Sequence, residues 1–221
     1  MIYLAEFLGS FFLVATVVGS GIMGERLSPD NAAVALLGNT IPTGAILFVL
    51  IKMFGPVSGA HFNPAVSTVF LFRKELDVQK FSKYIFCQFV GGMLAIVVTH
   101  FIFCNPSAGY SMSIFQVSEH APRSAELALL VSEIIATSGL ILTIIFVRKN
   151  DSGSVAMAVA LFITAGYWFT SSTSFANPMV TISRIFTDTF TGISPASVPY
   201  FIAGQLIGVA IAYILTKDIK E

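Results

Sequence analysis

The chain has 221 residues, of which 55% are hydrophobic and 11% charged, and its formal net charge is zero. Soluble domains carry roughly 25% charged residues, so this composition excludes a soluble protein and makes membrane lipid the expected surroundings. Zero net charge also leaves no basic face for nucleic acid.

Six mostly apolar runs are long enough to cross a bilayer, whose hydrocarbon core of about 30 Å needs about 20 helical residues. In chain order they are Tyr3–Met23, Asn31–Phe54, Phe81–Phe103, Leu127–Val147, Ser152–Thr170 and Ser197–Thr216. Two segments are left over, Gly55–Lys74 and Ser171–Thr189; each follows a complete span and contains one Asn-Pro pair. We therefore expect an all-α membrane protein with two additional short elements.

Lysine and arginine are distributed unequally between the two sides that six spans would create. One side holds Arg73, Lys74, Lys80, Lys83, Arg148, Lys149, Lys217 and Lys220, and the other holds Arg26, Arg123 and Arg184. Since loops rich in these residues stay in the cytoplasm, both termini are predicted to be cytoplasmic. Lys52, near the end of the second span, is expected to reach the headgroups on the same side.

The two Asn-Pro pairs mark an internal repeat. Aligning Asn63 with Asn177 superposes "NPAVSTVFLF" on "NPMVTISRIF", and Glu6 and Glu133 lie in the first and fourth spans. An odd number of spans in each half makes the halves enter the membrane in opposite directions, as in inverted repeats. The sequence predicts one domain, 1–221, built from inverted repeats at about 1–110 and 120–221.

Each Asn-Pro pair is also a helix start, because Asn is a preferred N-cap and Pro a preferred first helical residue. Helices are therefore predicted to begin at Pro64 and Pro178. The stretch from Pro64 to Lys74 would be about 16 Å long, half the hydrocarbon thickness. Non-helical backbone at mid-membrane is tolerated only where it lines protein or a water-filled cavity. The predicted fold is six transmembrane helices plus two re-entrant half-helices that meet at a pore.

The polar residues of this arrangement have expected roles. Asn63 and Asn177 are predicted to cap their own half-helices and to donate amide N–H groups to solutes at the pore midplane, with Met179 beside them. Glu6 and Glu133, which cost about 2.5–3.5 kcal/mol or more in lipid, are predicted to support the non-helical segments rather than to relay protons. For His61, packing at the cytoplasmic mouth and a gating role both remain open.

The segments "SGAHFNPAVS" and "FANPMVTISR", with Glu6 and Glu133 in their spans, resemble the major intrinsic protein family of aquaporins and aquaglyceroporins over essentially the whole chain. This resemblance implies a homotetramer in which each protomer has its own pore. It also implies passive passage of water or small uncharged solutes. The "VTIS" and "TDTF" that follow the second pair resemble a bacterial branch linked with arsenic resistance, which implies a bacterial inner membrane and arsenite or methylated arsenicals as solutes.

The chain departs from the family pattern after the second Asn-Pro pair. The family usually has Ala and then Arg there, where this chain has Met179 and Val180. Counting from the pairs without gaps predicts a selectivity filter of Thr43, Ala165, Ser174 and Val180, which would be wide and without fixed charge. Glycerol-like polyols and metalloid hydroxides such as arsenite are therefore expected to pass together with water.

Arg184 lies four residues beyond Val180, about 40° round the half-helix and farther outward. Two interpretations remain open for it. The side chain lines the outer vestibule and attracts anions, or it forms an ion pair with Asp188 one turn further on.

Other classes of function make different demands. A proton- or ion-coupled secondary transporter needs titratable residues in the pathway, for which Glu6 and Glu133 are the candidates, and a water-selective aquaporin needs a narrower filter. A closed scaffold would have a lumen filled by Met179 and phenylalanines. The histidines, His61, His100 and His120, form no catalytic or metal-binding motif. The sequence predicts no enzymatic activity, no cofactor and no metal site.

Overall fold

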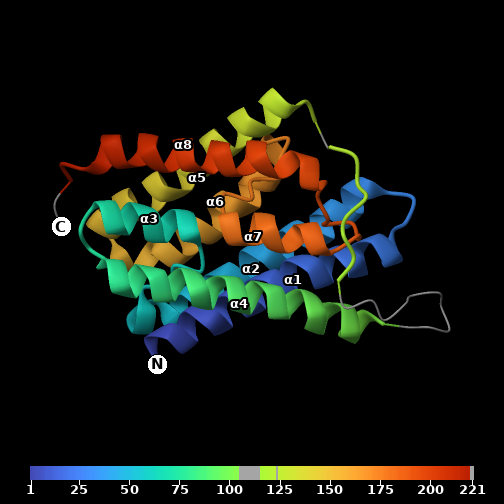
Figure 1. Cartoon of the computed structure of the whole chain (residues 1–221), viewed down its shortest axis with the longest axis horizontal. Helices are drawn as coiled ribbons and strands as arrows, with labels where there is room; N and C mark the ends of the chain where they lie inside the picture. Colours follow the sequence, from blue (N-terminus) through green and yellow to red (C-terminus); the bar gives the residue numbers. More distant parts are fainter. Residues whose placement is uncertain (105–114, 123, 220–221) are drawn as a thin grey trace.

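The computed structural model describes residues 1–104, 115–122 and 124–219 (Figure 1). Its long helices are α1 (Ile2–Leu27), α2 (Ala32–Ser58), α4 (Val78–Phe103), α5 (Glu126–Asn150), α6 (Val155–Phe169) and α8 (Val198–Thr216). Its short helices are α3 (Pro64–Phe72) and α7 (Pro178–Ser183), and short 3-10 turns occur at Ser152–Ser154, Arg184–Phe186 and Pro195–Ser197. Among the described residues, six helices are long and apolar enough to cross a membrane. The prediction of six spans and two short helices is confirmed.

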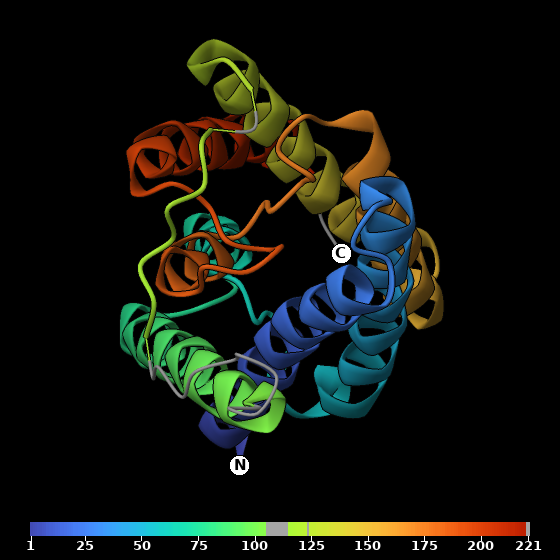
Figure 2. The ribbon, with the colours of Figure 1, turned by 90° about the vertical axis from the view of Figure 1, so that its right-hand side faces the viewer.

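The long helices surround the short ones. Helix α1 packs against α2 and α4, α5 packs against α6 and α8, and α2 packs against α6. Seen along the bundle, α3 and α7 lie between α4 and α8 and complete the ring (Figure 2). The chain thus forms two groups of three long helices, and each group brings one short helix to the same place.

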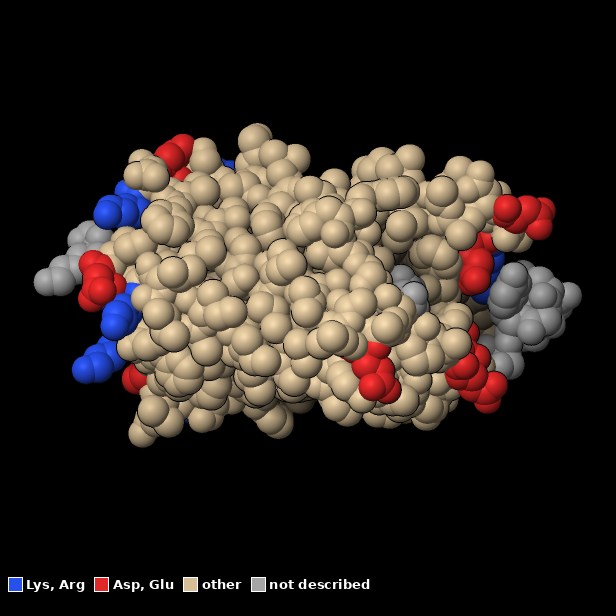
Figure 3. Space-filling model, turned by 90° about the horizontal axis from the view of Figure 1, so that it is seen from above, with Lys and Arg blue, Asp and Glu red and all other residues tan. Residues whose placement is uncertain are grey.

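The two short helices run in opposite directions from the middle of the bundle (Figure 1). We call the end at which both termini lie the proximal end, and the opposite end the distal end. Helix α3 runs towards the proximal end and α7 towards the distal end. On the face shown in Figure 3, a broad uncharged band separates charged residues at the two ends, with most of the visible Lys and Arg at the proximal end. This distribution suits a molecule whose middle lies in lipid.

The first short helix is shorter than the sequence predicts, and the second, for which only the start was predicted, is shorter still. Helix α3 ends at Phe72 rather than at Lys74, and α7 ends at Ser183, after which the chain tightens into a 3-10 turn that begins at Arg184. Helix α2, by contrast, continues four residues beyond its predicted end at Phe54, because Gly59 in the left-handed conformation caps it only there.

Candidate functional site

A cavity of about 770 Å³ lies inside the ring of helices and is lined by both short helices and by residues of α1, α2, α5 and α6. Its lining includes Lys80 at the proximal end, both asparagines of the Asn-Pro pairs, and Arg184 towards the distal end. Four more of the predicted site residues line it, namely His61, Thr43, Ser174 and Val180, whereas Glu6, Glu133, Ala165 and Met179 do not.

The asparagines hold the tips of the two short helices together. The side-chain carbonyl of Asn63 accepts the N–H of Ala65, and that of Asn177 accepts the N–H of Met179, so each caps its own helix. Each amide then crosses to the other half: Asn63 Nδ2 donates to the carbonyl of Ala176 at 2.7 Å, and Asn177 Nδ2 donates to that of Phe62 at 2.9 Å. Since an amide nitrogen has two N–H groups, each asparagine keeps one donor for the cavity.

The segments before the two tips share one backbone conformation. Ala60 and Ser174 have φ of 52° and 51°, and Phe62 and Ala176 have φ of 49° and 47°. Left-handed φ at residues other than glycine is unfavourable and persists only where the surroundings enforce it. It recurs here at positions 114 residues apart, the same offset as the asparagines. The repeat therefore extends to the backbone that carries the tips.

Glu6 supplies that enforcement in the first half. Its carboxylate is fully buried and accepts the N–H groups of His61 at 3.0 Å and Phe62 at 2.8 Å. It also accepts the hydroxyl of Ser58 at 2.6 Å and the side-chain amide of Gln88 at 2.8 Å. The carboxylate thus replaces helix hydrogen bonds for a segment that cannot make its own.

Glu133 does the same in the second half. It accepts the N–H groups of Phe175 at 3.0 Å and Ala176 at 2.8 Å, the hydroxyl of Ser172 at 2.5 Å and the amide of Gln205 at 2.7 Å. Four donors around each carboxylate, together with the absence of both carboxylates from the cavity lining, favour a supporting role over a proton relay. Gln88 and Gln205 were not singled out from the sequence. A polar residue in each of two otherwise apolar spans was the available signal.

The filter prediction needs one correction. Ala165 lies on the exposed face of α6 and is absent from the cavity lining, because counting without gaps assumes the same loop length after each preceding helix. Ile163 and Tyr167 of α6 face the cavity instead. The hydroxyl of Tyr167 lies 3.2 Å from that of Thr43 on α2, so the two side chains connect the neighbouring helices α2 and α6 in the cavity wall. Tyr167 is the residue that sequence reasoning missed.

Met179 also needs a correction. It is fully buried, and its side chain packs beside Gly92 of α4 rather than into the cavity. Along the same helix, Val180 faces the cavity, as its predicted place in the filter requires. The unusual residue in the second Asn-Pro segment therefore faces the protein and not the solute path.

Arg184 is 2% exposed and lines the cavity. Its guanidinium carbon lies 3.7 Å from the centre of the Phe175 ring, and its Nε donates to the carbonyl of Thr191. Asp188, the alternative partner considered above, is exposed and accepts the backbone N–H of Glu119 at 3.0 Å. A cation is therefore present in the lining, one turn farther out than the family pattern places it.

Two residues at the proximal side complete the lining. His61 Nδ1 lies 3.0 Å from the hydroxyl of Ser67, and its ring packs against Phe70 with centroids 4.7 Å apart. Lys52 does not simply extend into the headgroups: its Nζ donates to the carbonyl of Gly153 at 2.8 Å, and the side chain lines the cavity mouth. Among the described residues, no group of three or more His, Cys, Asp or Glu side chains is arranged to hold a metal ion.

Comparison with known proteins agrees with this geometry. The chain is 44% identical to the aquaglyceroporin AqpS of Rhizobium meliloti over 96% of its own length and 87% of that protein. It is 30% identical to the glycerol uptake facilitator protein-like 6 of Lactiplantibacillus plantarum, over 71% of this chain and 67% of the relative. The X-ray structure of the aquaglyceroporin from Plasmodium falciparum superposes with a TM-score of 0.76, covering 99% of this chain and 95% of that one. At 21% identity this last likeness supports the fold alone.

The model of one protein family matches residues 2–154, which is more than half of the chain. Together with the similarity to AqpS, this match shows that the chain belongs to the major intrinsic protein family, whose members are membrane channels for small solutes and not enzymes.

Proposed function

We propose that this protein is a passive channel for small uncharged solutes, in particular glycerol-like polyols and metalloid hydroxides such as arsenite, and for water. The observation that carries the proposal is the cavity of about 770 Å³ that both asparagine tips line. Asn63 and Asn177 each offer it one amide N–H, and hydroxyl groups of solutes can accept these donors.

The polar groups of the lining support solutes that carry several hydroxyl groups. Thr43, Tyr167 and Ser174 bring hydroxyls to the distal part of the cavity, and each hydroxyl can both donate and accept. Val180, Ile163 and Leu47 provide apolar surface between them. A wall with one polar and one apolar side fits a polyol, whose hydroxyls and carbon chain lie on different faces. The names of the two relatives above, which refer to glycerol, support the same class of solute.

Stopped-flow light scattering of proteoliposomes tests the proposal. We expect water, glycerol and arsenite to equilibrate faster than in protein-free liposomes of the same lipid, without dependence on an imposed proton gradient. Acceleration only under a proton gradient would instead indicate a coupled transporter.

A water-selective channel is the second candidate, and one observation favours it. Tyr167, which lines the cavity with its hydroxyl 3.2 Å from that of Thr43, brings a bulky ring to the wall where the sequence predicts the small Ala165. If water passes in the assay above while glycerol and arsenite are both excluded, the narrow filter prevails and the proposal of polyol passage fails.

Assembly and location extend the proposal. We propose a homotetramer with a pore in each protomer, in a bacterial inner membrane, with the proximal end and both termini in the cytoplasm. Large exposed apolar side chains such as Phe86, Leu161 and Ile214 on the outer surfaces of the helices supply area for both lipid and neighbouring protomers. Native mass spectrometry of the purified protein measures the number of chains, and a monomer at concentrations that support solute passage would contradict the tetramer.

A further inference from the structure

The proximal mouth of the cavity is lined by cations from three different helices. They are Lys52 near the end of α2, Lys80 in the first turn of α4 and Arg148 near the end of α5. These positions lie far apart in the sequence, and the fold brings them to one opening. The solute pathway proposed above does not need them.

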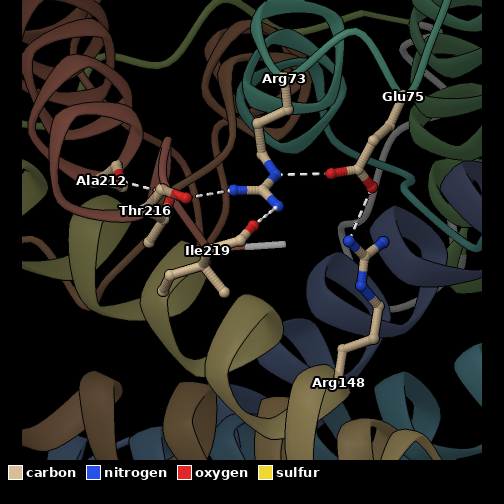
Figure 4. Close-up of polar contacts among 6 residues, drawn as sticks. All are labelled: Arg73, Glu75, Arg148, Ala212, Thr216 and Ile219. Carbon is tan, nitrogen blue, oxygen red and sulfur yellow. Dashed lines mark hydrogen bonds and ion pairs between the residues drawn. The ribbon is translucent and has the colours of Figure 1, made fainter. Parts of the chain in front are cut away.

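Little negative charge faces this opening. Among the described residues that line the cavity, Glu75 is the only acid. Its two carboxylate oxygens accept Arg73 Nε and Arg148 Nη2, both at 2.6 Å (Figure 4). Arg73 also donates to the carbonyls of Thr216 and Ile219, which ties the end of α8 to this group. The negative charge of Glu75 is thus shared by two arginines, and no other acid in the described lining pairs with Lys52 or Lys80.

The contacts of the two lysines confirm this imbalance. Lys80 Nζ lies 5.3 Å from the centre of the Tyr84 ring, and Lys52 Nζ donates to a backbone carbonyl. Neither lysine forms an ion pair within the described part of the chain. An aromatic ring and a carbonyl orient an ammonium group but carry no full negative charge of their own.

Two aspartates lie near the lysines and are occupied elsewhere. Asp77 Oδ1 accepts the backbone N–H of Lys80 and thereby caps α4. Asp151 accepts the hydroxyl of Ser154 and the N–H of Gly153, and these two bonds, with a smaller contribution from Lys52, hold the pKa of Asp151 below its usual value. Neither aspartate lines the cavity. Both aspartates keep their negative charge outside the lining, where Lys52, Lys80 and Arg148 outnumber Glu75 at the proximal mouth.

We propose that the proximal mouth is a binding site for a small free oxyanion of the inorganic phosphate type, held by Lys80, Lys52 and Arg148. A cleft lined by charge of one sign concentrates counter-ions, and Lys and Arg are the side chains that bind phosphate oxygens. A bound oxyanion would stand between the mouth and the asparagine tips. It would therefore compete with solutes that enter from the proximal side only.

The phosphate of a lipid headgroup has the same chemistry, but a free anion fits the placement better. The cations border the mouth of the same cavity that His61 and Asn63 line, whereas lipid headgroups surround the outer surface of the bundle. The inference does not depend on which solute the channel passes, because binding is measured without flux.

The test is titration of inorganic phosphate into the purified protein in nanodiscs of phosphatidylcholine, by calorimetry at fixed ionic strength. Lys83→Gln is the matched control: Lys83 lies three residues from Lys80 on the same helix, and its Nζ also sits 5.3 Å from a tyrosine ring, that of Tyr3, but it does not line the cavity. We expect Lys80→Gln and Lys52→Gln each to weaken phosphate binding at least tenfold and Lys83→Gln to leave it within twofold.

Three outcomes would overturn the inference. The wild-type protein fails to bind phosphate, or Lys83→Gln weakens binding as much as Lys80→Gln, which would indicate diffuse attraction by surface charge. In the third, exchange of phosphatidylcholine for phosphatidylglycerol abolishes phosphate binding, which would assign the site to a lipid headgroup. Lys52 and Lys80 lie on different helices. If one of the two variants fails to fold, phosphate binding by the other variant still tests the inference.

Discussion

At the scale of single residues, we expect selectivity to depend on a few side chains that line the distal part of the cavity. Tyr167 and Thr43 are 5% and 2% exposed; the Thr43 hydroxyl donates to the carbonyl of Asn39 at 2.8 Å, which leaves it to accept from Tyr167 or from a solute in the cavity. A polyol that passes this level can exchange its own hydroxyls for that contact. We therefore expect the tyrosine ring to contribute to the width of the passage and its hydroxyl to contribute to the polarity of the wall.

Tyr167→Phe separates these two contributions. The variant keeps the ring and loses one hydrogen-bonding group, worth about 0.5–1.5 kcal/mol, so glycerol flux should fall by about 2- to 10-fold while water flux changes little. Tyr167→Ala should instead widen the filter and raise the flux of longer polyols relative to glycerol. Both are measured as swelling rates in proteoliposomes. Equal effects of Tyr167→Phe on water and glycerol would show that the hydroxyl does not contact the solute.

Arg184 provides the only cation among the described residues that line the distal part of the cavity. We expect Arg184→Ala to lower the flux of arsenite and of small anions, because a buried cation in a low-dielectric wall acts strongly on polar solutes. Arg184→Lys keeps the charge and loses the planar stack on Phe175, so its solute flux should lie between that of the wild-type protein and that of Arg184→Ala. Unchanged flux in Arg184→Ala would assign the residue to support of the Thr191 segment.

Met179 shows how an unusual residue is accommodated without effect on the solute path. A Cβ added to Gly92 would lie 2.4 Å from the sulfur of Met179 and 2.8 Å from the hydroxyl of Ser183. The glycine on α4 thus makes the room that the longer side chain occupies. In the first half, Ala65 holds the equivalent position and is 1% exposed.

Gly92→Ala should therefore destabilise the protein by about 1–3 kcal/mol, as overpacked cores do. The double variant Gly92→Ala with Met179→Ala should recover most of this loss. Gly55→Ala is the control, because no heavy atom lies within 4 Å of an added Cβ there and alanine is the better helix former. The midpoint of thermal unfolding in detergent measures all of them. A double variant no more stable than Gly92→Ala would disprove the coupling.

The roles of single residues were predictable where local helix-capping preferences determine them. They were not predictable where the prediction depended on the length of a connecting segment. Asn63 and Asn177 follow from capping preferences, which need no tertiary information. Ala165 was wrong because the segment between α6 and the second tip has its own length. The prediction that Met179 lies at the pore was wrong. The next residue of α7, Val180, faces the cavity, and Gly92 of α4 leaves room for the Met179 side chain on the other side of the helix.

At the scale of elements, each non-helical segment depends on one buried glutamate. The expectation that these carboxylates support the segments rested on their cost in lipid, and each one accepts two backbone N–H groups. The contributions of Gln88 and Gln205 were not predictable in the same way. Neutral amides are inexpensive in a span, and only the packing of α4 and α8 beside the short helices brings them to the carboxylates.

Glu133→Gln tests this dependence. An amide presents N–H where two of the four donors now point, so at least two buried donors lose their acceptor, at about 1–3 kcal/mol each. We expect a large loss of thermal stability and of solute flux together. Glu126→Gln, at the exposed start of the same helix, should change neither measurably. Full stability of Glu133→Gln would mean that the segment before the second tip is held by other contacts.

At the scale of the whole molecule, the charge distribution predicts how the protein sits in the membrane. Lys74, Lys80, Lys83 and Lys217 lie at the proximal end with the termini, whereas Lys220 and Arg123, which the sequence argument also counted, fall outside the described residues. The six spans were predictable because hydrocarbon thickness fixes their length. Their exact ends were not, because capping residues such as Gly59 set them.

The orientation itself is open to direct measurement. In a background with Cys87 and Cys104 replaced by serine, single cysteines can be placed at four exposed positions: Asp30 and Asp188 at the distal end, and Lys74 and Lys217 at the proximal end. The excess of Lys and Arg at the proximal end predicts that it stays in the cytoplasm. A membrane-impermeant maleimide should therefore label Asp30→Cys and Asp188→Cys in intact bacteria, and Lys74→Cys and Lys217→Cys only after lysis. Each pair takes one position from each half of the chain, so the reverse pattern would invert the orientation, and a split within a pair would contradict the arrangement of six spans.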